Sequence, residues 1–257
     1  MTNAVHLSHA EFDIVWELLG LGEHPYPISV PSFGATMDER AALRDRVLRE
    51  LAERGLHDGR ELHPRLEDLL VMLVRNRFTI DGQLAVGRHL RVLAAGRGDY
   101  GLLAVLTDDD LRLEPVRGGA VVSAVVALLP DEKPGPGGPV TLPSALFGEA
   151  AEAYEGSGYL GFERVMQRGG ITGRGLRTLS TLVESGRHGG GQLAANSVDR
   201  VGRRTRSAVL NWFDTEAGRY VVYAERRRDR EEWLTFTPGD AQRIAQRLTD
   251  LVASVNP

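Results

Sequence analysis

The same order of short alternating segments and one amphipathic helix occurs twice in this chain, and this constrains the fold more than any other feature. Shifting the sequence by 117 positions aligns Gly101 with Gly218, and after a longer turn a shift of 121 aligns Leu113 with Leu234. Alternation of apolar and polar residues is typical of strands with one buried face. We therefore predict two related βββα halves, at about 78–130 and 201–255.

Two such halves bury most apolar surface when they join into one antiparallel sheet about a pseudo-two-fold axis. Helices are then expected to pack on one side of this sheet, and the other face is expected to lie open. Residues 131–139, DEKPGPGGP, are rich in proline and glycine and are predicted to form a linker.

Local signals predict where the helices begin. Ser8 and Thr36 each stand three residues before a glutamate, which is the spacing of a capping box. Pro64 is expected at the start of a third helix, and Thr237 is expected to cap the last one, with Pro238 in its first turn. The glycine-rich segment 185–191, SGRHGGG, is predicted to be a mobile loop.

Composition excludes several classes of site. The chain has no cysteine, which excludes disulfides, thiolate catalysis and cysteine-ligated metals. No apolar run approaches the roughly 20 residues needed to cross a bilayer, and no signal peptide is visible at the N-terminus. We therefore expect a cytoplasmic protein with no stable membrane association.

No catalytic or cofactor-binding motif stands out. The sequence contains no P-loop, nucleophile elbow or dinucleotide fingerprint, and its 7 histidines are scattered. The glycine-rich segment 168–175, RGGITGRG, lacks the Lys-Ser/Thr pair that follows in a P-loop. We expect no enzyme activity, no cofactor and no metal.

An arginine-rich predicted hairpin at 203–230 favours a second function class. Aromatic residues interleave with its arginines, as in sheets that stack nucleic-acid bases. Acidic residues surround it, however, and the whole chain has 31 basic and 35 acidic residues, a formal net charge of -4. Nucleic-acid binding is kept as the alternative function, although a polyanion is not the expected partner. The arginines are Arg203, Arg204, Arg206, Arg219, Arg226, Arg227, Arg228 and Arg230.

Three long segments together resemble the EspG family, the cytosolic chaperones associated with ESX (type VII) secretion in actinobacteria. They are 7–56, which begins LSHAEFDIVWELLG, 102–130, which begins LLAVLTDDDLRLEP, and 218–251, which begins GRYVVYAERRR. The resemblance covers nearly the whole chain in the right order, although no single piece is a diagnostic motif. It implies one α+β domain, 1–257, with a central antiparallel sheet, two helical groups and an internal quasi-two-fold.

The resemblance also implies a function. The protein would be a non-catalytic chaperone that binds the tip of a helical-hairpin substrate of the PE–PPE type, a heterodimer, and keeps it soluble for secretion. Such tips expose apolar residues, which an open sheet face could shield. Self-association into a homodimer when no cargo is bound is left open.

The strand period of two selects candidate contact residues. If Leu210 and Trp212 face the helices, their neighbours in sequence face the opposite side. On the adjacent strand, either Tyr220 and Val222 or Val221 and Tyr223 accompany them, and we choose the first pair. The segment around His188 is expected to close over cargo, and the alternative is that Phe213 and Tyr220 simply complete the core. The predicted cargo-contacting residues are Val209, Asn211, Phe213, Tyr220 and Val222.

Overall fold

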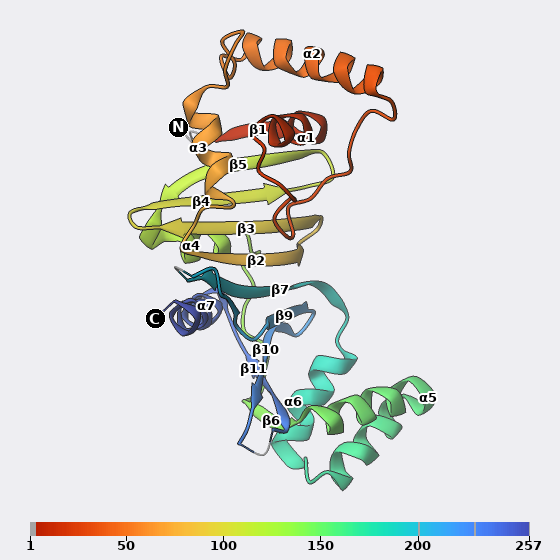
Figure 1. Ribbon diagram of the computed structural model, residues 1–257. Helices are drawn as coiled ribbons and strands as arrows, with labels where there is room; N and C mark the ends of the chain where they lie inside the picture. The colour runs from red at the N-terminus through yellow and green to blue at the C-terminus, as the bar shows by residue number, and fades with distance from the viewer. Residues whose placement is uncertain (1–3, 200, 229, 257) are drawn as a thin grey trace.

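The strands form one continuous antiparallel sheet at the centre of the molecule (Figure 1). The computed structural model describes residues 4–199, 201–228 and 230–256. The sheet has 11 strands in the order β1-β5-β4-β3-β2-β7-β9-β10-β11-β6, and β8 pairs with β7 beside this path. The α+β class and the antiparallel central sheet predicted from the sequence are confirmed.

The N-terminal half begins with an edge strand and three helices, continues with four strands and ends with one helix. Its elements are β1 (Val5–Ser8), α1 (His9–Leu18), α2 (Met37–Glu53), α3 (Pro64–Met72), β2 (Phe78–Ala85), β3 (His89–Arg97), β4 (Tyr100–Leu106), β5 (Asp110–Arg117), the 3₁₀ turn η1 (Gly118–Ala120) and α4 (Val121–Val126).

The C-terminal half follows nearly the same order. Its elements are β6 (Val140–Pro143), α5 (Ser144–Arg168), α6 (Gly173–Glu184), β7 (Arg187–Val198), β8 (Arg204–Arg206), β9 (Leu210–Thr215), β10 (Gly218–Arg226), β11 (Glu232–Pro238) and α7 (Ala241–Val255). A kink at Gly158, with φ 62° and ψ −155°, divides α5 into two helices, so this half also has three helices after its edge strand.

The two halves meet where β2 pairs with β7, from Phe78 opposite Ser197 to Ala85 opposite Gly190. The expected βββα unit is wrong for 78–130, where four strands, β2 to β5, precede the last helix. Each half also extends beyond the units expected at 78–130 and 201–255, because an edge strand and helices precede them. The predicted single domain 1–257 includes residues 1–3, 200, 229 and 257, which lie outside the described residues. The common origin of the halves stays a prediction.

Helices cover both faces of the sheet, whereas the sequence led us to expect them on one side only. On one face, α4 and α7 pack over the centre against residues such as Val92, Val105 and Trp212. On the other face, α1 to α3 cover one end and α5 and α6 cover the other, as two helical groups (Figure 1). The second face is thus open only in its centre. The groups lie there because each has its own apolar stripe to bury.

The predicted helix starts are correct in the N-terminal half. Ser8 Oγ accepts a hydrogen bond from Glu11 N at 3.2 Å, and Ser8 N donates to Glu11 Oε2 at 2.7 Å, which completes the capping box. Thr36 and Glu39 form the second box. Among the described residues, no helix is long and apolar enough to cross a membrane.

The last helix begins later than predicted. Thr237 and Pro238 belong to β11, where they pair with β10, and Asp240 caps α7 by accepting from Arg243 N at 2.8 Å. Ladder pairing with β10 therefore outweighs the local preference of Thr-Pro for a helix start, because the strand lies inside the sheet between β10 and β6.

Residues 187–191 of the segment predicted as a mobile loop are instead the start of β7, in the middle of the sheet. Its glycines allow close approach of the neighbouring strands. A Cβ on Gly190 would lie 2.9 Å from the Trp212 carbonyl oxygen, and one on Gly191 would lie 2.8 Å from the Gln83 carbonyl oxygen. Glycine in a strand can thus mark tight packing.

The linker 131–139 is held against β10. Lys133 O accepts from Arg219 N at 2.7 Å, and Gly135 N donates to Arg219 O at 2.9 Å. The Tyr220 hydroxyl donates to Pro136 O at 2.9 Å. This segment therefore joins the two halves as a fixed part of the fold.

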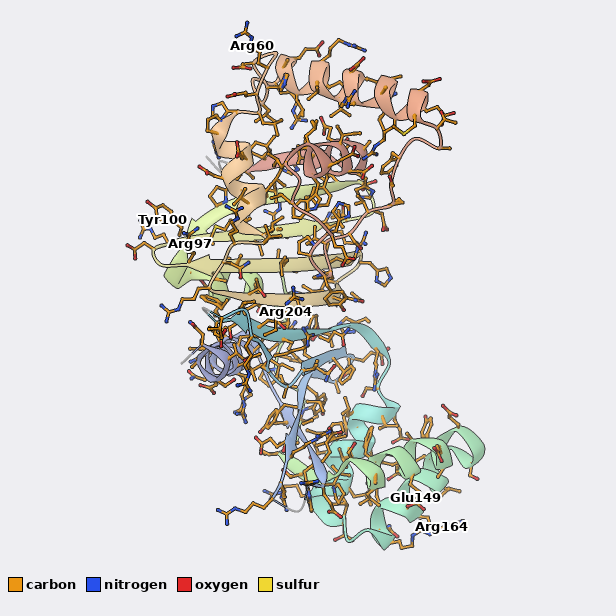
Figure 2. The ribbon with its side chains drawn as sticks, in the orientation of Figure 1. Arg60, Arg97, Tyr100, Glu149, Arg164 and Arg204 are labelled. Atoms are coloured by element: carbon orange, nitrogen blue, oxygen red, sulfur yellow. The ribbon has the colours of Figure 1, made fainter. Side chains whose placement is uncertain are left out.

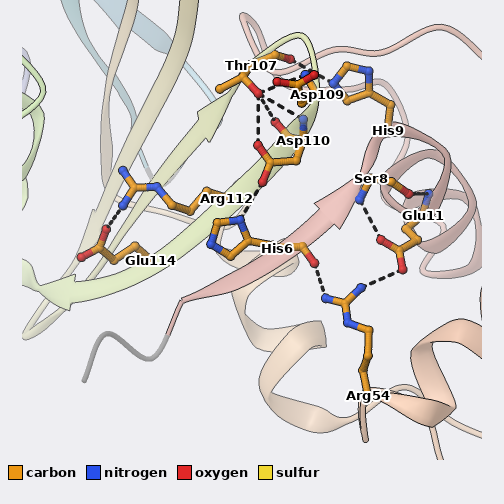
Figure 3. A network of polar contacts seen from close by, with 10 residues as sticks. All are labelled: His6, Ser8, His9, Glu11, Arg54, Thr107, Asp109, Asp110, Arg112 and Glu114. Carbon is orange, nitrogen blue, oxygen red and sulfur yellow. Dashed lines mark hydrogen bonds and ion pairs between the residues drawn. The ribbon is translucent and has the colours of Figure 1, made fainter.

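Side chains fasten the N-terminal edge strand to its neighbours (Figure 3). Arg54 donates to Glu11 Oε1 at 2.8 Å and to the His6 carbonyl oxygen, and His6 Nδ1 lies 2.6 Å from Asp110 Oδ2. Burial acts to raise the pKa of Asp110, but hydrogen bonds from His6 and Thr107 outweigh it and leave this pKa below its ordinary value. His6 thus serves the packing of β1 on β5.

Candidate functional site

The open centre of the second sheet face is a groove of about 710 Å³ between the two helical groups. We call it the central groove. Strands β2, β3, β7 and β9 supply most of its lining, so both halves of the chain contribute. The lining residues are Gln83, Leu84, Ala85, His89, Leu90, Arg91, Asp108, Arg187, His188, Gly189, Gly190, Gly191, Gln192, Asn211 and Phe213.

One row of polar residues crosses four strands on the floor of the central groove. Arg91, Gln83, Gln192 and Asn211 are successive cross-strand partners on β3, β2, β7 and β9. Neither the Gln192 nor the Asn211 side-chain amide has a hydrogen-bond partner among the described residues. The floor therefore offers free donors and acceptors to a ligand.

The next row along the strands has small residues in its middle. His89, Ala85, Gly190 and Phe213 are its successive cross-strand partners. The small residues lie at the junction of β2 and β7, and the two rings stand at the ends of the row. A side chain from a binding partner can therefore approach the backbone at this junction.

Polar contacts hold the rim of the central groove. The segment between α1 and α2 reaches the floor, where Gln83 Nε2 donates to the Tyr26 hydroxyl at 2.8 Å and Arg91 Nη1 donates to Ser29 O at 2.6 Å. At the other end, the Arg187 guanidinium lies 4.2 Å from the centre of the Phe213 ring. These contacts hold the side chains of the rim in place before any partner binds.

The predicted alternation along β9 agrees with the structure. Leu210 and Trp212 pack on the α4 and α7 side, whereas Asn211 and Phe213 line the central groove. Val209 precedes β9 and lines a smaller pocket beside α7, so it lies outside the groove. The contact role of Asn211 and Phe213 stays a prediction.

The other two predicted contact residues are buried under the C-terminal helices. Tyr220 is 0% exposed and Val222 is 6% exposed, and both belong to the core formed with α5 and α6. Burial raises the pKa of the Tyr220 hydroxyl. Both share a face with Phe213 and Asn211, their direct partners on β9, but the helices cover them. The weighed alternative was that Phe213 and Tyr220 complete the core. The burial of Tyr220 agrees with it, and Phe213 packs partly buried against the same core.

Three floor residues were not predicted. Gln83 and Arg91 lie in the first half, whereas all the predicted contact residues lie between 209 and 222. Gln192 lies on β7, the start of which was predicted to be a loop. The internal repeat carries the missing signal, since a sheet joined across β2 and β7 must place residues of both halves on one floor.

The arginines of the predicted hairpin do not form one surface. Arg219 is fully buried, Arg206 forms an ion pair with Asp81, and Arg227 stacks on the Trp233 ring at 3.5 Å. The chain also does not fold as one hairpin there, since β8 pairs with β7 whereas β9 pairs with both β7 and β10. The nucleic-acid alternative thereby loses the continuous basic sheet on which it depended.

One histidine that lines the central groove, His188, has an acidic partner. His188 Nε2 lies 3.3 Å from Glu132 Oε2, outside the floor rows. Within residues 4–199, 201–228 and 230–256, no group of three or more His, Asp or Glu side chains could hold a metal ion.

Comparisons with known proteins give a consistent assignment. A model of the EspG family matches residues 8–250. The chain is 25% identical over 260 residues to the ESX-3 secretion-associated protein EspG3 of Mycolicibacterium smegmatis, which covers 98% of this chain and 87% of that protein. Its fold is similar to that of the Mycobacterium tuberculosis type VII secretion chaperone EspG5, solved in complex with a PE25–PPE41 dimer. For that pair the TM-score is 0.77 at 17% identity, over 99% of this chain and 97% of the other.

Proposed function

The chain belongs to the EspG family, and from this membership we propose that it is a non-catalytic chaperone of type VII secretion. It would act in the cytoplasm. Its cargo would be the tip of a helical-hairpin substrate of the PE–PPE type, bound in the central groove and kept soluble until export. The observation that carries the proposal is the uncovered sheet centre between two helical groups.

The width of the central groove suits the tip of a helical hairpin. Its floor spans β3, β2, β7 and β9, which is three inter-strand spacings of about 4.8 Å, or roughly 14 Å. Two packed helices have axes about 8–10 Å apart and are each about 10–12 Å across with their side chains, so the pair is wider than the floor. The floor would therefore take the turn at the tip and one helix end, while the helices lean on α1 to α3 on one flank and on α5 and α6 on the other.

The chemistry of the floor refines what the cargo must present. The amides of Gln192 and Asn211 and the guanidinium of Arg187 favour backbone carbonyls and polar side chains at the end of the hairpin. Carbonyls at a helix C-terminus lack intrahelical partners and would find donors here. Apolar side chains of the tip would lie against Phe213 and Ala85.

The relatives support this class of cargo. The M. tuberculosis relative is a chaperone in complex with a PE25–PPE41 dimer, and the M. smegmatis relative is a secretion-associated protein. A stable complex of this chain would bury at least about 1,000 Å² in total, more than the groove floor alone provides. The flanking helical groups would supply the rest.

Co-expression with a PE–PPE-type pair tests the proposal. We expect the pair to co-purify with this chain at a fixed ratio, and to give less soluble protein when it is expressed alone. A pair that stays insoluble, or that is soluble without ever associating with the chain, would count against the proposal. The variant Gln192→Trp, which fills the groove floor, should lose the complex, whereas Arg204→Trp on exposed β8 should retain it.

A further inference from the structure

A second large cleft lies at the opposite ends of the central strands, where α3 leads into β2 and where β7 and α7 end. Its volume is about 960 Å³. We call it the arginine cleft. It is lined by Arg75, Asn76, Arg77, Arg97, Ser197, Val198, Asp199, Val255 and Asn256.

The arginine cleft has an excess of positive charge. Among the described residues that line it, three arginines face one carboxylate, that of Asp199. Arg77 is held by a hydrogen bond from Nε to Asn256 Oδ1 at 2.8 Å, which leaves its terminal nitrogens available. Neither the Arg75 nor the Arg97 side chain has a hydrogen bond or an ion pair with any described residue.

The acidic group found among the described lining residues is already engaged. Asp199 Oδ1 accepts hydrogen bonds from Val201 N at 2.9 Å and from Arg203 N at 2.8 Å. Its carboxylate therefore stabilises its own turn, and it does not form an ion pair with the cleft arginines among the described residues. Guanidinium groups that are exposed and unpaired in this way suit carboxylate recognition.

An adjoining cleft of about 750 Å³ shares Arg75 and Arg97 with the arginine cleft. It is lined in addition by Tyr100 and by apolar residues of α3, including Val71 and Met72. Tyr100 is 76% exposed and projects with Arg97 from the hairpin that joins β3 and β4 (Figure 2). Asp68 and Asp99 balance the charge in this second part. The surface thus changes from basic to apolar across the two shared arginines.

We propose that the arginine cleft is a second protein-docking surface, and that it binds a short acidic segment of a partner protein. The acidic residues of the segment would pair with Arg75, Arg77 and Arg97, and a neighbouring apolar side chain would pack on Tyr100. Tyr and Arg are enriched among the residues that dominate binding energy at protein interfaces. Because the arginine cleft is basic and the adjoining cleft is partly apolar, the segment must present its acidic residues and its apolar side chain in this order.

This docking surface is separate from the central groove. From Arg77 to Leu84, seven residues of extended chain span about 23 Å. A partner in the arginine cleft therefore leaves the groove open, and both sites can be filled at once. The inference does not depend on the proposed cargo.

Binding of a short fluorescent peptide of glutamate and leucine, measured by anisotropy with the full chain, tests the proposal. We expect saturable binding that weakens as salt increases, because exposed charge pairs are screened. The variant Arg75→Glu with Arg97→Glu should weaken it about tenfold or more, since two attractions become repulsions. Tyr100→Ala should weaken it with no change in salt dependence.

A matched control reverses the same number of charges elsewhere. Arg60 and Arg164 are exposed at opposite ends of the molecule (Figure 2), so Arg60→Glu with Arg164→Glu should bind the peptide as wild type does. Equal weakening in both double variants would overturn the proposal, because only net charge would then matter. Tighter binding of an RNA oligonucleotide of equal charge would also overturn it. Thermal melts of both variants exclude unfolding as the cause of any loss.

Discussion

Replacing Arg219 by methionine should destabilise the protein more than any surface change. Arg219 and Asp214 are 0% exposed and form two hydrogen bonds, from Nε to Oδ1 at 2.6 Å and from Nη2 to Oδ2 at 2.8 Å. The same Nη2 donates to Pro130 O at 2.9 Å, at the end of the N-terminal half. The pair thus joins β9, β10 and the segment that connects the two halves.

The magnitude follows from what each variant leaves behind. Arg219→Met leaves the Asp214 carboxylate buried and unpaired, and removing one partner of a buried pair costs about 3–5 kcal/mol. Total stability of a domain is about 5–15 kcal/mol, so this loss is a large fraction of it. Asp214→Leu should cost a similar amount, because it isolates the guanidinium.

The double variant should recover most of this loss. Arg219 Nη1 already lacks a partner among the described residues, so the native pair itself is imperfectly satisfied. With both charges gone, the main remaining defect is the Pro130 carbonyl without its donor, at about 1–3 kcal/mol. We therefore expect Asp214→Leu with Arg219→Met to be far more stable than the sum of the single variants implies.

Equilibrium unfolding in urea, followed by tryptophan fluorescence, measures all four proteins of this cycle. The reasoning is refuted if each single variant costs less than about 1 kcal/mol, or if the double variant loses the sum of both single losses. Either result would mean that water or a rearranged side chain satisfies the remaining charge, and that the pair does not fix the junction between the halves.

Two further predictions concern stability. Burial lowers the pKa of His24 from 6.5, although Asp13 acts to raise it, so the folded state disfavours protonated His24. The free energy of unfolding should therefore fall as pH drops below about 6.5. Urea unfolding of His24→Phe should lack this fall. Parallel pH profiles for the two proteins would contradict this. Gly191→Val should cost at least about 1–3 kcal/mol in thermal unfolding, since its Cβ would lie 2.8 Å from the Gln83 carbonyl oxygen, whereas Gly119→Val, with open space around it, should cost much less. Equal losses would show that glycine is not needed for packing.

Local sequence signals predicted the elements that depend on local physics. The capping boxes at Ser8 and Thr36 could be predicted from the sequence because the cap and the glutamate that completes it lie three residues apart. The alternation that places Asn211 and Trp212 on opposite faces of β9 could also be predicted, because it depends only on neighbouring residues. The repeat, detected as an offset between Gly101 and Gly218, indicated the joined sheet.

Features that depend on contacts between residues distant in the sequence could not be predicted from local patterns. The role of segment 185–191 as part of a central strand depends on its neighbours at Gln83 and Trp212, which local glycine content cannot reveal. The burial of Tyr220 and Val222 depends on where α5 and α6 dock, and periodicity gives the face of a strand without saying what covers it. The central groove, an uncovered part of a face, therefore had to come from the structure.

Calorimetric titration of a purified PE–PPE-type heterodimer into this chain tests the central claim most directly. We predict one heterodimer bound per chain, an affinity reduced at least about tenfold by Gln192→Trp, and unchanged binding with Arg204→Trp. Wild-type affinity in Gln192→Trp, with the heterodimer still bound, would place the cargo elsewhere on the molecule and contradict the assignment of the central groove.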